Sequence, residues 1–339
     1  MESGQLVTVF GAYGHTGRFV VAELVERGFV PVLSGRDAGK LESFAAAYPG
    51  AEVRQASIGD PASLDRALDG AAAVINAAGP FADTAAPVIE AALRAGIPYV
   101  DVAAEIEANV DTFARFAGAD TVVLPAMAFY GGLGDLLATA AMGDWASADE
   151  VHVAYGLSSW HPTAGTIAAG KVSRERRGGK HVRFANGRLE YTDAGGSAQE
   201  WEFPEPLGKR DVIGEFTMAD VVTIPSHLKV PEVRTYMAAG AAKDLMTPDS
   251  KAPVAVDDLG RSSQTFLVDV IVRSGGEERR IVARGQDIYA VTAPLAVEAV
   301  RRILAGQNRV NGVASAGELF DAPDFLRALA PHITVDAAV

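Results

Sequence analysis

The sequence contains no cysteine among its 339 residues. This absence excludes disulfide bonds, thiolate zinc sites, iron–sulfur ligation and cysteine nucleophiles, and it is compatible with the reducing cytoplasm in which we expect the protein. Histidine is scarce too, with six copies, and none stands at the spacing of a zinc-binding H-E-x-x-H motif. We therefore expect no metal site.

Positive charge is also in short supply. Lysine and arginine total 30 against 43 aspartates and glutamates, which gives a formal net charge of −13. An acidic surface repels phosphate backbones and anionic lipid, so we expect neither nucleic acid nor a membrane among the partners. The residues before the first predicted strand lack the basic start of a signal peptide, and we expect none.

The longest apolar stretch, residues 121–143, does not predict a membrane helix. It holds Pro125, Asp135 and the glycines at 131, 132 and 134, which a membrane-spanning helix would not normally combine. We interpret this stretch as a buried strand, a loop and then a helix.

Strand and helix signals alternate through the first 125 residues. Short apolar runs rich in β-branched residues are typical of strands, and the segments between them carry apolar residues at helical spacing. We expect strands at 6–10, 30–33, 53–56, 72–76, 99–102 and 122–124, and helices at 15–27, 38–48, 61–68 and 84–95. This alternation predicts βαβ units and therefore a Rossmann-type, doubly wound parallel α/β sheet.

The middle of the sequence changes to paired strands. The Asn186-Gly187 dipeptide, flanked by two short strand-like runs, predicts a hairpin with a type I′ turn. The Gly275-Gly276 pair turns a longer alternating run back on itself in the same way. We therefore expect an α+β second domain of antiparallel strands, with a helix at 166–176.

We divide the chain into a nucleotide-binding domain at 1–130, a substrate and dimerisation domain at 131–288, and C-terminal helices at 289–339 that return to the first domain. Those helices are expected at 293–304 and 316–329. Antiparallel strands with free edges in the second domain lead us to expect a homodimer.

Three glycines, at 11, 14 and 17, follow the first predicted strand and precede the first helix. The first allows a tight turn, the second lets a pyrophosphate approach backbone N–H groups, and the third lets helix and strand pack closely. The start of the helix adds partial positive charge. A purely structural glycine turn is the alternative. We predict a dinucleotide site whose contacts are Gly11, Tyr13, Gly14, His15, Thr16 and Gly17.

The end of the second predicted strand bears on which dinucleotide binds. It reads Ser34-Gly35-Arg36-Asp37, with Lys40 one helical turn further. NAD sites usually place an acidic residue here to bind the ribose hydroxyls. Arg36 is suited instead to a 2′-phosphate, which a guanidinium binds through two parallel hydrogen bonds. Asp37 competes with this interpretation, but it has helix capping as its alternative role. We predict NADP(H), with Ser34, Arg36 and Lys40 in its site.

The segment 76–81 follows the fourth predicted strand, at the edge where ligands bind in open α/β sheets. Its small residues leave room for the nicotinamide ribose, although a plain turn before a helix is the alternative. We assign to the cofactor site Ala78, Gly79, Pro80 and Phe81. Asp101 and Glu105 follow the fifth strand, where one of them is placed to orient a ligand; Glu105 has stabilisation of a helix N-terminus as its alternative role.

Four motifs together resemble the saccharopine dehydrogenase-like superfamily. They are Gly-Ala-Tyr-Gly-His-Thr-Gly-Arg from Gly11, Ser-Gly-Arg-Asp from Ser34, Asn-Ala-Ala-Gly-Pro-Phe from Asn76 and Tyr-Val-Asp-Val-Ala-Ala-Glu from Tyr99. The most similar branch comprises bacterial proteins with a saccharopine dehydrogenase NADP-binding domain, which include trans-acting enoyl reductases. The resemblance is specific over 5–140, and it implies a Rossmann domain, an α+β second domain and hydride transfer with NADPH.

No familiar acid–base device accompanies the phosphate loop. No tyrosine has a lysine four residues on, as in classical short-chain dehydrogenases, and the G-x-S-x-G elbow of an α/β-hydrolase is missing. His161 is our first candidate proton donor, because it lies in a loop after a predicted strand and histidine titrates near neutral pH. An exposed loop histidine is the alternative. Tyr130, on a glycine-rich loop expected to face the nicotinamide, is the second candidate, and His227 is the third.

We expect the catalytic cleft between the carboxyl edge of the first sheet and the second domain, lined by 76–81, 130–132 and 161–166. The leading function is an NADPH-dependent reductase that acts on a C=C or C=N bond of a small, largely apolar substrate. The alternative, motivated by the missing catalytic signature, is a non-catalytic NADP-binding sensor or regulatory protein.

Overall fold

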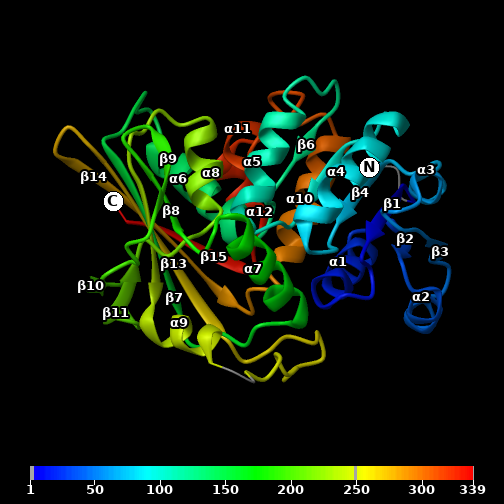
Figure 1. Ribbon diagram of the computed structural model, residues 1–339, viewed down its shortest axis with the longest axis horizontal. Helices are drawn as coiled ribbons and strands as arrows, with labels where there is room; N and C mark the ends of the chain where they lie inside the picture. The colour runs from blue at the N-terminus through cyan, green and yellow to red at the C-terminus, as the bar shows by residue number, and fades with distance from the viewer. Residues whose placement is uncertain (1–3, 248–249, 339) are drawn as a thin grey trace.

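Two β-sheets stand side by side in the computed structural model, which describes residues 4–247 and 250–338 (Figure 1). The first is a six-stranded parallel sheet in the order β3-β2-β1-β4-β5-β6. Its strands are β1 Leu6–Phe10, β2 Val30–Gly35, β3 Glu52–Gln55, β4 Ala73–Asn76, β5 Tyr99–Asp101 and β6 Val123–Leu124. The strand order reverses between β1 and β4, as in dinucleotide-binding sheets. The doubly wound parallel sheet expected from the sequence is therefore confirmed.

Helices follow the strands of this sheet, and in two of them a nearby side chain caps the N-terminus. They are α1 His15–Glu26, α2 Ala38–Ala45, α3 Pro61–Leu68, α4 Phe81–Ala95 and α5 Ile106–Arg115. The carboxylates of Asp37 and Asp60 accept hydrogen bonds from backbone N–H groups three residues on, and Pro61 fixes the first turn of α3. Gly96 ends α4 in the left-handed conformation, at φ +67°.

The second sheet, within the described residues, has nine strands. They are β7 Glu150–Leu157, β8 His181–Ala185, β9 Arg188–Thr192, β10 Ala198–Glu202, β11 Lys209–Gly214, β12 Val233–Ala238, β13 Thr265–Ser274, β14 Glu277–Gln286 and β15 Ile333–Ala338. Seven run in the order β10-β11-β12-β7-β13-β14-β15, while β8 joins β12 and pairs with β9. The pairs are antiparallel except β12 with β7, whose parallel pairing is possible because the long segment 158–232 connects them.

Two turns in the second sheet agree with their sequence signals. Asn186 and Gly187 both take positive φ, at 54° and 73°, as a type I′ turn requires, and they join β8 to β9. Gly275 and Gly276 likewise have positive φ and join β13 to β14, which pair along ten residues each. The antiparallel hairpins expected in the second domain are therefore present.

Residues 289–338 differ in part from the expectation of helices on the first domain. Helix α10 (Thr292–Leu304) contacts α1, β4 and β5. By contrast, α11 (Ala316–Leu319) and α12 (Ala322–Ala328) lie on α6 (Gly134–Met142), and β15 pairs with β14. The single helix expected at 316–329 is wrong, because Asp321 caps a new helix and Pro323, which lacks an N–H, cannot continue α11.

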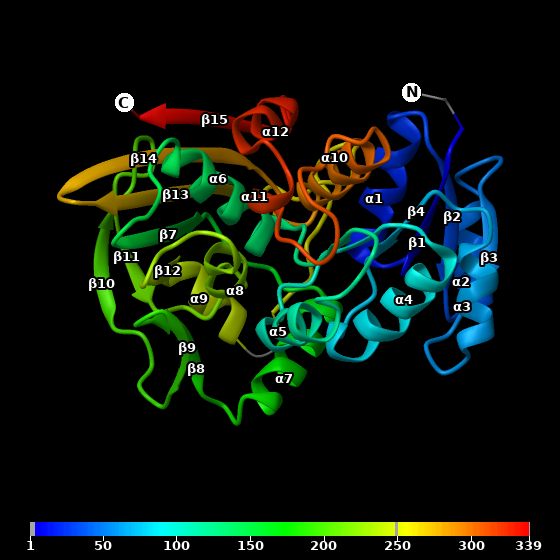
Figure 2. The same cartoon turned by 90° about the horizontal axis from the view of Figure 1, so that it is seen from above.

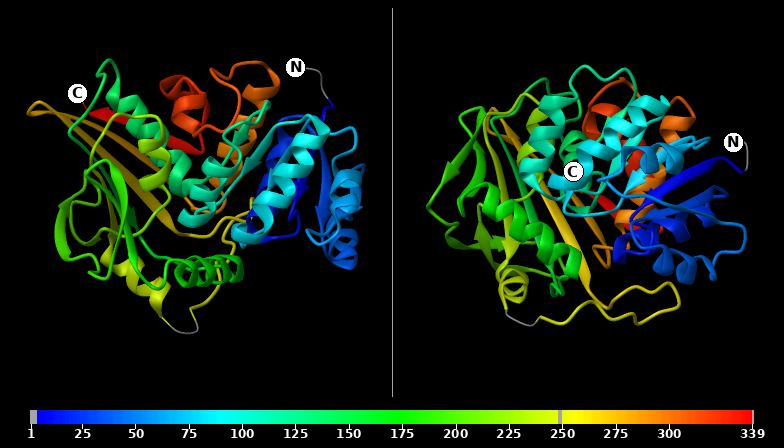
Figure 3. Two further views of the ribbon diagram at one scale, coloured as in Figure 1. Left: turned by 45° about the horizontal axis from the view of Figure 1, so that its top comes forward. Right: turned by 45° about the vertical axis from the view of Figure 1, so that its right-hand side comes forward.

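Helices of both domains fill the space between the sheets. Figure 2 shows α5, α7 (Ala164–Arg176) and α10 there. Helix α7 contacts α4 and α5, which follow strands β4 and β5, so the second domain reaches the carboxyl edge of the first sheet. Residues 250–262 run back toward α1 (Figure 3), where a Cβ on Gly260 would lie 3.7 Å from the Phe19 ring.

The remaining short helices belong to the second domain. They are η1 Phe129–Leu133, α8 Asp220–Thr223, η2 Ile224–Ser226 and α9 Ala239–Met246. In the part of the chain that the structure describes, no helix combines the length and apolar character needed to cross a bilayer.

Candidate functional site

The phosphate loop shows why its glycines are needed. Gly11 has φ +92°, and a Cβ there would meet the backbone of Ala77 and Ala78 at 2.9 Å. A Cβ on Gly17 would stand 2.2 Å from the Gly11 carbonyl oxygen, so only glycine lets α1 pack this closely on the loop. Gly14 precedes α1, and no side chain caps the helix. The free N–H groups at the start of α1 therefore fit an anion.

An open cavity of about 630 Å³ lies beside the carboxyl end of β2. It is lined by Tyr13, Arg18, Asp37, Gly39, Lys40, Ser43 and Phe44. The Asp37 carboxylate accepts a hydrogen bond from the Lys40 backbone N–H at 3.0 Å, so it has the helix-capping role that the sequence left open. Arg36 is exposed at the same strand end. Ser34 is buried, and its hydroxyl has no hydrogen-bond partner.

Arg18 is a cation of this cavity that sequence reasoning did not single out. It is exposed on the first turns of α1, its Nε donates to the Tyr13 carbonyl oxygen at 3.2 Å, and its guanidinium lies 5.9 Å from the Phe44 ring. The Lys40 ammonium lies 5.8 Å from the Tyr13 ring. Its position in the sequence could have indicated this role. An arginine directly after the third glycine lies one helical turn past the second glycine, beside the expected anion site.

A buried polar network holds the carboxyl ends of β4 and β5. The Asn76 amide donates to the hydroxyls of Thr84 and Tyr99 at 3.2 and 3.1 Å, and its oxygen accepts from the Ala78 backbone N–H at 3.0 Å. The Asp101 carboxylate accepts from the Tyr99 hydroxyl at 2.8 Å, and burial raises the pKa of Asp101 to about 6. These bonds hold Asn76 beside the loop that carries Ala78 and Gly79.

Glu105 caps a helix other than its own. Its carboxylate accepts from the backbone N–H groups of Phe81 and Ala82 at 2.7 and 3.2 Å, which fixes the start of α4. Burial raises the pKa of Glu105 to about 7. The predicted contact residues Pro80 and Phe81 therefore stand at the first residues of α4, with the Phe81 ring buried.

Tyr130 lies in a buried aromatic group at the edge of the second domain. Its ring centroid is 5.3 Å from that of Trp160 and 5.0 Å from that of Tyr155. Its hydroxyl is buried without a hydrogen-bond partner, and burial raises the pKa of Tyr130 well above its ordinary value. Behind it, the Tyr155 hydroxyl contacts both Asp220 oxygens, at 2.9 and 2.8 Å.

The predicted histidine donors occupy different environments. His161 is exposed, and its backbone oxygen is the atom that accepts a bond, from the Tyr289 hydroxyl at 3.4 Å. His227 lies in the second domain, where its Nε2 is 2.7 Å from an Asp135 oxygen. The other Asp135 oxygen accepts from the Gly317 N–H at 2.6 Å. His227 is therefore held by the Asp135 carboxylate, which also joins α6 to α11.

Tyr289 is the second side chain that sequence reasoning missed. Its hydroxyl accepts from Trp160 Nε1 and from the Thr163 backbone N–H, both at 3.3 Å, and lies 3.0 Å from the Thr166 hydroxyl. Its ring lies 5.1 Å from the His15 ring. No motif marks it, because it sits in the irregular stretch between β14 and α10.

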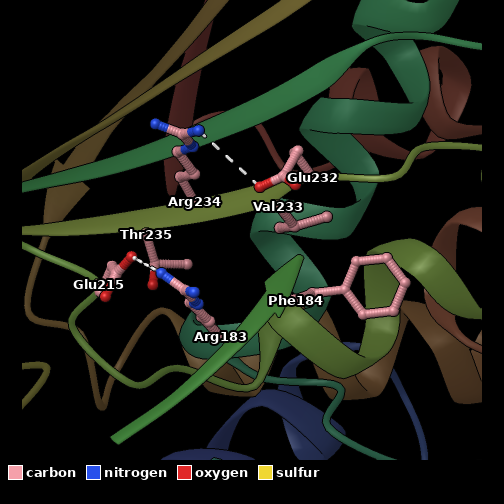
Figure 4. A pocket seen from close by; sticks show the side chains of 7 residues that line it. All are labelled: Arg183, Phe184, Glu215, Glu232, Val233, Arg234 and Thr235. Atoms are coloured by element: carbon pink, nitrogen blue, oxygen red, sulfur yellow. Dashed lines mark hydrogen bonds and ion pairs between the residues drawn. The ribbon is translucent and has the colours of Figure 1, made fainter. Parts of the chain in front are cut away.

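A smaller cavity, of about 160 Å³, lies in the second domain between β8 and β12 (Figure 4). Arg183 pairs there with Glu215 at 2.9 Å, and Arg234 with Glu232 at 3.8 Å. None of the residues predicted from the sequence lines it. Since its charges neutralise one another, we assign no function to this cavity.

Comparison with known proteins supports a nucleotide-binding role. Residues 11–126 match the NAD(P)H-binding family. Saccharopine dehydrogenase (L-Glu forming) from Saccharomyces cerevisiae shares the fold, with a TM-score of 0.65 and 10% identity over 99% of this chain and 100% of that chain. The WlbA (WbpB) dehydrogenase from Thermus thermophilus gives 0.44 and 15% over 96% and 92%, too low a TM-score to support an argument. No curated protein matches the sequence.

The residues of the phosphate loop thus fit the dinucleotide that the family match indicates. The matched domain supports binding of a nicotinamide dinucleotide, as expected from the sequence. The chain has an NAD(P)H-binding domain at 11–126 and, over its whole length, the fold of the yeast saccharopine dehydrogenase.

Proposed function

We propose that the protein is an NADPH-dependent reductase that acts on a C=C or C=N bond of a small, largely apolar substrate. The observation that carries this proposal is a continuous line of contacts from the phosphate loop into the second domain. His15 packs on Tyr289, Tyr289 bonds to Trp160, and Trp160 packs on Tyr130. This line runs beside the carboxyl edge of the first sheet, where the ligand of such a sheet binds.

Aromatic and small side chains surround the proposed substrate position. Trp160, Tyr130 and Phe81 are buried, and a Cβ on Gly79 would lie 3.9 Å from the Ala169 methyl group of α7. The acids nearest to this edge, Asp101 and Glu105, are engaged by backbone N–H groups. These surroundings favour an apolar substrate over one with several charges.

The cations around the β2 end support NADPH over NADH. Arg18 and Lys40 line the same cavity, and exposed Arg36 stands at the end of the strand. The one acid in that cavity, Asp37, caps α2. An arginine fork suits a phosphate, whereas an NAD site needs a free carboxylate for the ribose hydroxyls.

The bound dinucleotide supplies the hydride, and the chain must hold the proton. We assign this role to the Tyr130 hydroxyl before His161, because the hydroxyl is buried beside Trp160 and has no hydrogen-bond partner among the described residues, which leaves its proton free for a ligand. In the proposed step one atom of the double bond would gain the hydride and the other the Tyr130 proton, and the tyrosinate so formed would regain a proton from water admitted when the product leaves. His161, being exposed, is the second choice.

A non-catalytic NADP sensor is the second candidate function. Among the described residues, the Tyr130 hydroxyl has no partner that would return a proton to it, as a preformed relay would. The two functions differ in turnover. Protein incubated with NADPH and a panel of enones, enoyl thioesters and cyclic imines should oxidise the cofactor with at least one compound if it is a reductase. A tight NADPH complex that oxidises with none of them would favour the sensor.

A further inference from the structure

Helix α7 is weakly packed along its length and held at its two ends. One of its thirteen residues, Ser173, is buried, and the helix contains Gly165 and Gly170. At its C-terminal end, Arg176 lies 2.6 Å from an Asp111 oxygen of α5. Glycines lower helix stability, and most helical stability in proteins comes from packing. The position of α7 therefore depends on its end contacts.

Tyr289 makes the contacts at the other end. Thr163 caps α7 by accepting from the Thr166 N–H at 3.1 Å. The Tyr289 hydroxyl bonds to the backbone N–H of Thr163 and to the Thr166 hydroxyl, so both residues of the cap are tied to one phenol. The same hydroxyl accepts from Trp160 Nε1 at 3.3 Å. A single oxygen thus links Trp160 to the first turn of α7.

The other end of the Tyr289 side chain faces the phosphate loop. Its ring meets the His15 ring edge-on, with an interplanar angle of 86°. His15 Nε2 is buried and has no hydrogen-bond partner. The backbone of Tyr289 is itself fixed, because the fully buried Asp287 carboxylate accepts from the N–H groups of Tyr289 and Ala290 at 2.9 and 3.0 Å. Because the backbone of Tyr289 is held in place, a change in the position of the His15 ring acts on the Tyr289 side chain.

We propose that Tyr289 is a positioning residue that couples the dinucleotide site to α7, so that a bound dinucleotide, by restraining His15, orders the start of α7 over the substrate. Dinucleotide binding at the loop is indicated by the family match, but the substrate position under α7 rests on the proposed function. The start of α7 has a loose and an ordered state. In the proposed coupling, bound NADPH lowers the free energy of the ordered state relative to the loose one.

Hydrogen–deuterium exchange of the full chain, with and without NADPH, tests this coupling without any substrate. In the wild-type protein, NADPH should slow exchange in peptides covering 158–170 by about threefold or more, because opening of α7 becomes rarer. Tyr289→Phe keeps the ring on His15 and removes the hydroxyl. It should bind NADPH within about threefold of the wild-type Kd, yet show no NADPH-dependent slowing in those peptides.

The matched control is Tyr191→Phe, which removes the hydroxyl of a tyrosine in β9 that is 44% exposed and should behave as wild type. Thr166→Val, which removes one partner of the Tyr289 hydroxyl, should reduce the slowing in part. The proposal is overturned if Tyr289→Phe retains the full effect of NADPH, or if NADPH binds the wild-type protein and does not alter exchange in α7. Absence of NADPH binding would overturn both proposals, and a binding titration detects it separately. A failure of reductase activity leaves the exchange result unaffected.

Discussion

Replacement of Arg36 by alanine should weaken NADPH binding and leave NADH binding almost unchanged. Arg36 is exposed at the end of β2. Its carbonyl oxygen accepts a hydrogen bond from Gln55 Nε2 at 2.9 Å, whereas its guanidinium makes no bond to the other described residues. Its guanidinium is therefore placed to bind an anion. A charge-assisted hydrogen bond contributes about 1.5–3 kcal/mol when one partner is removed.

Two structural features place the loss at the lower end of this range. Arg18 and Lys40 line the neighbouring cavity and would still attract the 2′-phosphate. The site is also open to solvent, where salt screens charges. We therefore expect a loss of about 1.5 kcal/mol, or a roughly tenfold higher Kd for NADPH. The double variant with Arg18→Ala should lose more than the sum of the single losses, since each arginine compensates in part for the other.

Calorimetric titration of each variant with NADPH and with NADH, at one low salt concentration, measures both affinities. Arg210→Ala is the matched control, because it removes an exposed arginine of β11 in the second domain and changes the net charge equally. Equal losses for the two cofactors would show that Arg36 supports the fold. An unchanged NADPH affinity would refute the assignment of the 2′-phosphate to this strand end.

Three further predictions concern the loop, the proton donor and the dependence of stability on pH. Gly14→Val should abolish NADPH binding in a titration while circular dichroism shows a folded protein. Valine can adopt the backbone angles of Gly14 (φ −67°, ψ 166°), but the valine side chain would fill the pyrophosphate position. Retained NADPH affinity would contradict this assignment. Once a substrate is found, Tyr130→Phe should lower kcat by about 10²–10⁴-fold and His161→Ala by less than tenfold; the reverse order would restore His161 as the donor. Burial raises the pKa of Asp220 to about 7 from its ordinary 3.8, so the free energy of unfolding should fall as pH rises between these values. Urea denaturation should show a flatter profile for Asp220→Asn, and an unchanged slope would contradict the buried titration.

Local rules were sufficient to predict most of the first domain from the sequence. The strand at Leu6–Phe10 and the helix at Pro61–Leu68 have the bounds expected, because apolar runs, glycines and capping residues act within a few positions. The Asn186-Gly187 turn is of the same kind, since its positive φ values follow from two residues.

Features that depend on distant residues were not predictable. Helix α4 begins at Phe81 and not at Thr84, because Glu105, more than twenty positions away, caps it. Tyr289 gains its contacts only when the chain returns from β14 to the first domain. The Tyr155–Asp220 pair joins residues that lie 65 positions apart. Periodicity and motif spacing carry no information on such pairings.

The path of the chain between the two sheets has a consequence for how the protein is made. The chain leaves the first domain before β7, returns in α10 and leaves again to place β15 beside β14. A ribosome releases residues in order. Helix α1 can therefore pack on α10, and Arg27 can bond to Glu298, only after nearly 300 residues have emerged. The edge of β14 likewise stays open until residues 333–338 follow. Neither domain is complete as a separate piece, and we expect both to reach their final packing late and together.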